Sequence, residues 1–182
     1  MRFTPTAIPE VQIIDPQVFE DERGMFMETW HVERFAQAGI QASFVQHNHS
    51  GSVRGILRGL HYQIQRPQGK LVRVILGEVF DVAVDLRRSS KTYGKWVGVT
   101  LSAARRQLMW IPPGLAHGFF VLSEYADFEY ACTDFYVPQD ERTLLWNDPS
   151  IGIRWPLLPG QPPTLSPKDQ RGRPLAEAEC YP

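Results

Sequence analysis

The sequence predicts an all-β protein whose strands form a sandwich or barrel of the jelly-roll type. Short segments of alternating apolar and polar residues follow one another through the middle of the chain, and Gly, Pro, Ser or Asp closes each of them. Residues 70–88 show the pattern best, because after a break at Gly77 the even-numbered positions from Phe80 to Leu86 are all apolar. Many short strands at nearly regular spacing are typical of this architecture.

The remaining elements can be taken in chain order. Residues 30–39 (WHVERFAQAG) form the one predicted helix, and Gly39 is expected to end it. Beyond Trp155 the chain is too rich in proline for regular structure, so we expect it to wrap irregularly over the surface. No repeat or linker interrupts the chain, which predicts a single domain over residues 1–182. From residue 70 onward, the predicted strands lie in residues 70–88, 95–102, 107–113, 117–123 and 127–137.

Composition narrows the class of protein and of partner. The chain has 182 residues, of which 43% are hydrophobic, and its formal net charge is -1. A nearly balanced charge argues against nucleic acid or an acidic membrane as the main partner, whereas an anionic small molecule needs only a few basic residues in one pocket. Cys132 and Cys180 are far apart and suggest neither a disulfide framework nor a zinc knuckle. The N-terminus lacks the apolar segment of a signal peptide, so we expect a cytoplasmic protein without a membrane partner.

Two histidines lie on separate predicted strands. His61 is flanked by Leu60 and Tyr62 in the segment GILRGLHYQ, and His117 follows a Pro-Pro-Gly turn in IPPGLAHGF. Either histidine alone is more often a hydrogen-bonded core residue than a functional one. Two of them in one barrel, whose open mouth is a natural pocket, suggest either a metal site or an acid–base site.

The spacing of the other ligands tests the metal hypothesis. Pro112, Gly114 and His117 resemble the PxGxxH element of metal-binding cupins. Such a site also needs a His-x-His pair and a nearby glutamate, but position 63 is glutamine and residues 64–69 contain no glutamate. Two imidazoles without a third ligand make a poor transition-metal site. The sequence therefore disfavours a metal-dependent cupin such as a dioxygenase.

Acid–base chemistry is the reading that remains. Lys70 opens an apolar strand, and turned inward it would stabilise an enolate oxygen rather than form a solvated strand end. Tyr130 and Tyr136 share the same parity within residues 127–137, so both face the cavity unless they are packed aromatics. Alternation also places Arg58 on the face opposite the histidine three residues later. Both enter one pocket only if the intervening glycine allows a bulge.

Three less regular segments carry further polar groups. FEDERG, residues 19–24, is either a solvated loop or a segment that places Arg23 on a phosphate. QHNHS, residues 46–50, is either a polar loop or a hydrogen-bonding edge for a base or a sugar. Asp169 lies in the C-terminal wrap, and nothing in the spacing shows whether it reaches His61.

Seven short motifs occur in the order typical of one known family. They are FEDERG, QHNHS, GILRGLHYQ, QGKLVRVILGEVFDVAVDLR, IPPGLAHGF, WNDPSIGIRWP and LSPKD, from Phe19 to Asp169. Each is weak alone, but seven in order are specific, and the set closely resembles the dTDP-4-dehydrorhamnose 3,5-epimerase family. The resemblance implies a cupin-type jelly roll, a homodimer, and neither a metal nor an organic cofactor.

The resemblance also implies a reaction and a set of site residues. The reaction would convert dTDP-4-dehydro-6-deoxy-D-glucose into its L-rhamno epimer on the route to dTDP-L-rhamnose. His61 resembles the family's base and Asp169 the carboxylate that orients it. Tyr130 resembles the acid on the opposite face of the sugar, Lys70 lies near the developing enolate, and Tyr136 stacks on thymine. The remaining positions that resemble nucleotide-sugar ligands are Phe19, Arg23, Glu28, Gln46, Asn48, Arg58, His117, Glu141 and Lys168.

Two further hypotheses compete with this one. A mono-epimerase acting at C3 or at C5 alone would use the same base, acid and lysine, so the sequence separates it poorly from a double epimerase. A sugar-nucleotide binding module without activity would carry the same pocket with inert histidines. Both make predictions about proton exchange that differ from those of the double epimerase.

Overall fold

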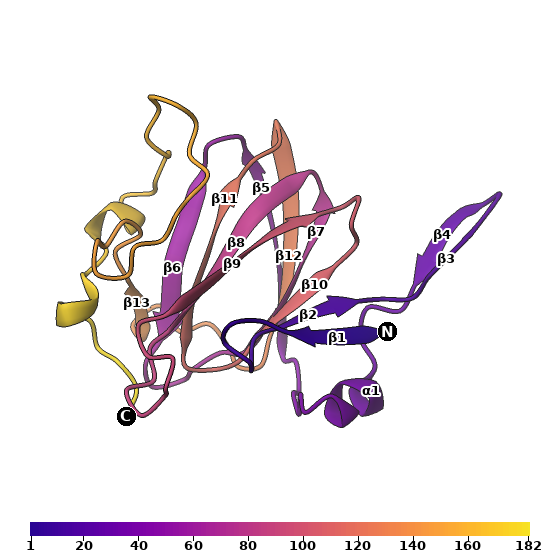
Figure 1. Cartoon of the computed structure of the whole chain (residues 1–182), viewed down its shortest axis with the longest axis horizontal. Helices are drawn as coiled ribbons and strands as arrows, with labels where there is room; N and C mark the ends of the chain where they lie inside the picture. The colour runs from indigo at the N-terminus through magenta and orange to yellow at the C-terminus, as the bar shows by residue number, and fades with distance from the viewer.

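The computed structural model describes all residues from 1 to 182, and strands make up most of its regular structure (Figure 1). It has one α-helix, α1 (Val32–Gln37), and two short 3-10 helices, η1 (Asp169–Arg171) and η2 (Leu175–Glu177). None of these helices has the length and apolar character needed to cross a membrane. The strands are β1 (Arg2–Pro5), β2 (Gln12–Asp15), β3 (Val18–Asp21), β4 (Gly24–Met27), β5 (Gln46–Val53), β6 (Leu57–Gln63), β7 (Lys70–Leu76), β8 (Glu78–Asp85), β9 (Trp96–Ser102), β10 (Leu108–Ile111), β11 (Leu115–Val121), β12 (Tyr125–Cys132) and β13 (Glu141–Thr143).

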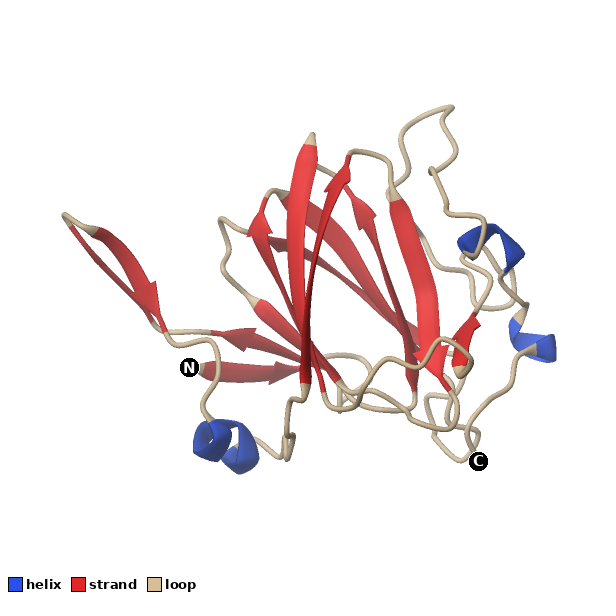
Figure 2. Ribbon diagram, turned by 180° about the vertical axis from the view of Figure 1, so that it is seen from behind, coloured by secondary structure: helices blue, strands red, loops and turns tan.

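Two antiparallel sheets face each other and form the barrel. One has the order β1-β2-β10-β7-β12-β5, and the other has the order β13-β6-β11-β8-β9. The β3–β4 hairpin forms a separate two-stranded sheet that projects away from the barrel. Figure 2 shows this hairpin on one side of the molecule and the irregular C-terminal segment on the other. The predicted all-β jelly roll with a minor helix and a C-terminal wrap is therefore confirmed.

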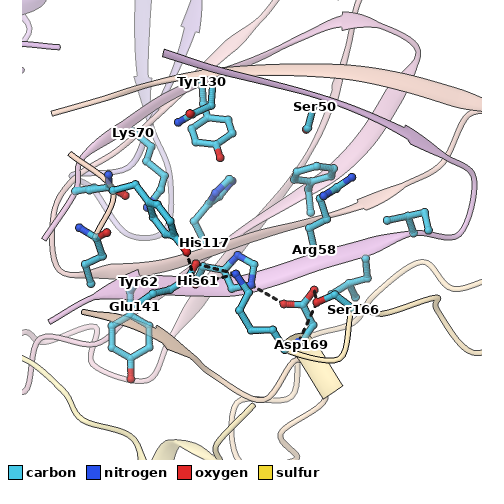
Figure 3. A pocket seen from close by; sticks show the side chains of 18 of the residues that line it. Ser50, Arg58, His61, Tyr62, Lys70, His117, Tyr130, Glu141, Ser166 and Asp169 are labelled. Carbon is cyan, nitrogen blue, oxygen red and sulfur yellow. Dashed lines mark hydrogen bonds and ion pairs between the residues drawn. The ribbon is translucent and has the colours of Figure 1, made fainter. Parts of the chain in front are cut away.

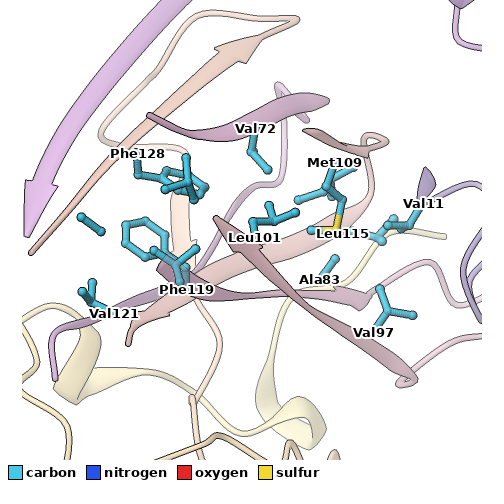
Figure 4. Close-up of a cluster of buried hydrophobic side chains, with 14 of the residues drawn as sticks. Val11, Val72, Ala83, Val97, Leu101, Met109, Leu115, Phe119, Val121 and Phe128 are labelled. Carbon is cyan, nitrogen blue, oxygen red and sulfur yellow. The ribbon is translucent and has the colours of Figure 1, made fainter. Parts of the chain in front are cut away.

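The space between the sheets is divided between a polar cavity (Figure 3) and a packed core (Figure 4). Because successive residues of a strand point to opposite faces, Val72 and Val74 of β7 reach the core while Arg73 lies on the outer face. Phe119 of one sheet stacks on Phe128 of the other with ring centroids 4.3 Å apart. Burial of such side chains contributes about 25 cal/mol per Å² of apolar surface, which makes this core the main source of stability.

Strand β6 changes its register against β11 between Arg58 and His61. His61 is paired with His117, but Arg58 is paired with Phe119, so β6 has one more residue than β11 across this interval. Gly59 adopts a φ of +126°, which a residue with a side chain rarely adopts. The extra residue turns Arg58 and His61 toward the same cavity. The bulge that was required for Arg58 and His61 to share one pocket is therefore present.

The structure decides one open alternative and corrects one predicted boundary. Residues 46–50, for which a loop and an edge were both open, begin β5 at the edge of the larger sheet. The strand predicted over residues 127–137 ends at Cys132, so Tyr136 lies beyond it and parity does not set its direction. The chain leaves the sheet there because the Asp134 carboxylate accepts a hydrogen bond from the next backbone N–H and pairs with Arg66. The N-terminal strands β1 to β4 were not predicted.

Replacing Gly59 with alanine tests the constraint at the bulge. A Cβ atom at this position would lie 2.5 Å from the Gly118 Cα atom and 2.9 Å from the His117 carbonyl oxygen. We expect Gly59→Ala to lower the free energy of unfolding by about 3 kcal/mol, because the backbone of one strand must move. Urea denaturation measures this change.

Gly24→Ala is the matched control for that variant. Gly24 has a similar φ of +120°, but no atom lies within 4 Å of its added Cβ. The free energy of unfolding of this variant should therefore fall by only roughly 1 kcal/mol, the cost of placing alanine at a positive φ. Equal losses in the two variants would contradict the close approach of β6 and β11 as the cause.

Candidate active site

The cavity between the sheets has a volume of about 670 Å³ and is lined by strands from both of them (Figure 3). The irregular C-terminal segment closes one of its sides, with Thr164, Leu165 and Ser166 in the wall. A pocket of this size suits a ligand larger than a simple sugar. It brings together the predicted residues His61, Lys70, Tyr130, Asp169, Gln46, Asn48, Arg58, His117, Tyr136, Glu141 and Lys168.

His61 and Asp169 form a hydrogen-bonded pair in this cavity. The His61 Nε2 atom lies 2.5 Å from Asp169 Oδ1, and the Ser166 hydroxyl donates to Asp169 Oδ2 at 2.7 Å. Burial opposes ionisation of Asp169, but the hydrogen bonds from His61 and Ser166 prevail and lower the pKa of this carboxyl. Asp169 therefore stays charged near neutral pH and fixes the proton on Nε2, which leaves Nδ1 as the basic atom of the ring.

Tyr130 and Lys70 face this pair from the other sheet. His61 belongs to β6, whereas Tyr130 and Lys70 belong to β12 and β7, and the Tyr130 ring points into the cavity (Figure 3). Burial raises the pKa of Tyr130 to about 12, so its hydroxyl keeps its proton. Lys70 is buried with no carboxylate within 4.0 Å, and burial lowers the pKa of its ammonium. The cavity thus has a hydrogen-bonded imidazole on one wall and a phenol with an amino group on the opposite wall.

His117 lies beside a buried carboxylate that the sequence did not identify as part of the site. The His117 Nε2 atom is 3.0 Å from both oxygens of Asp81, whose exposure is 0%. Burial raises the pKa of Asp81, and the charge and hydrogen bond of His117 oppose that rise. The available signal was an aspartate in the apolar strand β8, which pairs with the strand of His117.

The mouth of the cavity is formed by a chain of polar contacts. The Tyr136 hydroxyl donates to Glu141 Oε2 at 3.0 Å, and the Lys168 ammonium donates to the same carboxylate at 2.8 Å. The Tyr136 backbone N–H donates to the Gln46 side-chain oxygen at 2.8 Å. Although Tyr136 lies outside the strand, these contacts hold it at the cavity.

Strand β5 and the bulge of β6 supply a polar wall. Gln46, Asn48 and Ser50 alternate along β5 and therefore all face the cavity. Arg58 has no carboxylate within 4.0 Å; its Nε atom donates to Ser52, so its charge is available to an anionic ligand. The Ser50 hydroxyl is buried and has no hydrogen-bond partner in the protein, so it is a further polar group that the sequence reading missed.

Three predicted site residues lie outside the cavity of their own chain. Phe19 and Arg23 belong to the projecting β3–β4 hairpin, where Phe19 is 55% exposed and Arg23 pairs with Asp21. Glu28 follows the hairpin and pairs with Arg34 of α1 at 3.0 Å. Within one chain these residues do not line the cavity, because the hairpin extends away from the barrel, and their role in binding substrate stays a prediction.

The structure gives no arrangement of ligands for a metal ion. No group of three or more His, Cys, Asp or Glu side chains is placed to hold one. Gln63, at the position where a metal-binding cupin has its second histidine, uses its amide to bind the backbone of two loops. The two histidines of the cavity are instead each paired with an aspartate.

Comparison with known proteins adds independent findings. Residues 5–177 match the family model described as dTDP-4-dehydrorhamnose 3,5-epimerase. A protein of that name from Pseudomonas aeruginosa is 57% identical over 183 residues, covering 100% of both chains. A dTDP-4-dehydrorhamnose 3-epimerase from Streptomyces niveus is 41% identical and covers 98% of this chain and 86% of its own.

A solved structure extends the likeness to three dimensions. The dTDP-6-deoxy-D-glucose-3,5-epimerase from Legionella pneumophila, solved in complex with dTDP-4-keto-L-rhamnose, superposes with a TM-score of 0.94. It is 50% identical, and the match covers 98% of this chain and 94% of that one. The barrel described above and the fold of that protein are therefore the same along nearly their whole length.

The buried pair of His117 and Asp81 can be tested through stability. We expect His117→Phe to lower the free energy of unfolding by about 3 kcal/mol or more, because it leaves a buried carboxylate without its partner. The double variant His117→Phe/Asp81→Leu should recover most of the loss, since no buried charge remains at the pair. Urea denaturation of the variants measures both effects. A double variant as unstable as His117→Phe would show that the carboxylate is not the cause.

Proposed function

The chain belongs to the dTDP-4-dehydrorhamnose 3,5-epimerase family, and we infer from this that it epimerises C3 and C5 of dTDP-4-dehydro-6-deoxy-D-glucose. The product is dTDP-4-dehydro-L-rhamnose, on the route to dTDP-L-rhamnose. The observation that carries this function beyond family membership is the placement of His61 and Tyr130 on opposite sheets of one cavity. Epimerisation removes a proton from one face of a carbon and returns one to the other face, and it needs groups on both sides.

We propose that His61 is the base. The C4 ketone acidifies the hydrogens on C3 and C5, but they remain weaker acids than an imidazolium, so their removal needs a positioned base. In the gluco chair these two hydrogens are axial on the same face of the ring, and one base on that face serves both. Asp169 supports this role, because its charge at 2.5 Å stabilises the imidazolium that forms and fixes the ring.

Tyr130 and Lys70 complete the proposed reaction. Removal of the proton places negative charge on the C4 oxygen, and the Lys70 ammonium stabilises that charge in a site shielded from water. A pKa of about 12 keeps Tyr130 protonated, so it can deliver a proton to the face opposite His61. Because base, acid and cation all belong to the chain, the proposed mechanism uses no cofactor.

The nucleotide diphosphate fits the polar wall and the mouth of the cavity. Arg58, which has no carboxylate partner, is suited to the diphosphate, and Gln46 and Asn48 offer amide donors beside it. Tyr136 is 46% exposed at the mouth, where its ring face is available to stack on thymine. Binding of these groups anchors the substrate so that the sugar is held between the two walls. We propose that Glu141, Lys168 and His117 contribute further substrate contacts from the cavity wall.

We also propose that residues 1–182 form one domain that acts as a homodimer in the cytoplasm. The hairpin exposes Phe19, Met25 and Phe26 at 55%, 53% and 69%, and an isolated two-stranded hairpin is marginally stable alone. A second chain would cover these side chains. The hairpin would then carry Phe19, Arg23 and Glu28 to the partner's cavity, which accounts for their place outside their own.

Proton exchange in heavy water tests the reaction. We expect the enzyme to introduce deuterium at both C3 and C5 of the keto sugar, because each inversion takes its new hydrogen from a group that exchanges with solvent. Mass spectrometry and NMR measure the label. His61→Ala should lower exchange at both carbons by about 10³-fold or more while dTDP affinity is kept.

Each competing function gives a different labelling result. Deuterium at one carbon only would identify a mono-epimerase and contradict the double reaction. Full exchange by the His61→Ala variant would contradict the proposed base. Binding of dTDP without any exchange would identify a binding module.

Mixing two defective variants tests the hairpin's place in the dimer. In a mixed dimer of Arg23→Ala and His61→Ala chains, one cavity has an intact His61 together with the partner's intact Arg23. We expect co-expression to restore about a quarter of wild-type activity at low substrate, since half of the dimers are mixed and each has one complete site. If the hairpin served its own cavity, no complete site would form and activity would stay at the level of the single variants.

A further inference from the structure

Gln63 is a buried polar residue in the cavity wall to which neither the reaction nor the family resemblance assigns a role. It is 2% exposed and lies two residues after His61 on β6, so both side chains point toward the interior. A buried amide must satisfy its donors and its acceptor within the protein, and the partners it uses show what it holds in place.

All three partners of the Gln63 amide are backbone groups. Its Nε2 atom donates to the Phe135 carbonyl at 3.1 Å and to the Arg66 carbonyl at 2.8 Å. Its Oε1 atom accepts from the Val137 N–H at 2.7 Å. Phe135 and Val137 are the two neighbours of Tyr136, so one side chain holds the backbone on both sides of that tyrosine.

The same residue is connected to the partner of the Tyr136 hydroxyl. Glu141 of β13 is paired with Gln63 in the smaller sheet, and its carboxylate accepts from Tyr136. Gln63 therefore holds the backbone on both sides of Tyr136, and Glu141, its neighbour in the sheet, holds the Tyr136 hydroxyl. Tyr136 lies beyond the end of β12, so these contacts hold it in position and the hydrogen bonds of the sheet do not.

We propose that Gln63 is a positioning residue for the nucleotide end of the site: it fixes Tyr136 and thereby sets affinity for the nucleoside, not the rate of proton exchange at the sugar. This inference rests on the proposed function, in which Tyr136 stacks on thymine. It assigns a different use to the position that holds a histidine ligand in metal-binding cupins. Here the side chain faces the cavity but forms its hydrogen bonds with backbone groups of the loops at the cavity mouth.

Gln63→Met tests this assignment, with dTDP as the probe. Methionine has a similar length but makes none of the three hydrogen bonds. We expect the dissociation constant for dTDP, measured by calorimetry, to rise about tenfold, with a similar rise in KM. The kcat for exchange in heavy water should stay within about twofold, because the His61–Asp169 pair is unchanged. Gln107→Met is the matched control, since the Gln107 amide binds Asp15 away from the cavity.

A double-mutant cycle separates positioning from a general structural effect. If Gln63 acts through Tyr136, then Gln63→Met should weaken dTDP binding no further in a Tyr136→Ala background. Independent, additive losses would overturn the proposal, as would a fall in kcat with unchanged dTDP affinity. If Gln63→Met does not fold, Gln63→Glu serves in its place, because it keeps the acceptor for Val137 and the shape while losing both amide donors. Wild-type affinity for dTDP in that variant would equally overturn the proposal.

The wild-type protein separates this inference from the function on which it rests. Failure of the wild type to bind dTDP would refute the proposed function itself. Binding of dTDP by the wild type, with equal affinity in the folded Gln63→Met variant, would refute only the role of Gln63.

Discussion

The close approach of strands β6 and β11 at Gly59 and Gly118 is the constraint on which the site depends. A Cβ atom on Gly118 would lie 2.6 Å from the Arg58 carbonyl oxygen, and one on Gly59 would lie 2.5 Å from the Gly118 Cα atom. Only a pair of glycines allows these backbones to touch while β6 accommodates an extra residue. Without that residue, Arg58 and His61 would point to opposite faces of the sheet. The bulge therefore places in one cavity the guanidinium proposed to bind the diphosphate and the imidazole proposed to act as base.

The polar groups brought together in this way oppose folding, and the barrel tolerates them because they are paired or reach the cavity. Asp81 and Asp169 are buried carboxylates, and each is hydrogen-bonded to a histidine. Lys70 is buried without an ion-pair partner, and burial lowers the pKa of its ammonium; a negative charge that develops beside it in the cavity would favour its charged form. The apolar cluster around Phe119 and Phe128 occupies the rest of the interior and offsets these costs.

The sequence predicted the parts of this structure that depend on local pattern. Alternation located the central strands, and the family resemblance carried by seven motifs in order supplied the residues that the cavity brings together. It did not show whether Asp169 reaches His61, because 108 positions separate them and the connecting segment has no periodic pattern. Tyr136 was predicted to lie on a strand because residue alternation does not show where a strand ends. In the structure the chain leaves the sheet at Asp134, before it reaches Tyr136. Asp81 was missed because its importance comes from the neighbouring strand.

Under the proposed roles, the residues that perform proton transfer do not decide how many carbons are inverted. C3 and C5 flank the same ketone, so one cation at the C4 oxygen serves both enolates, and one base and one acid on opposite faces serve both carbons. What differs between a single and a double inversion is how the ring is presented to His61 and Tyr130 between the two events. Under the proposed roles, a relative that keeps the same base, acid and lysine can therefore differ in outcome through residues that orient the ring and never touch the reacting carbons.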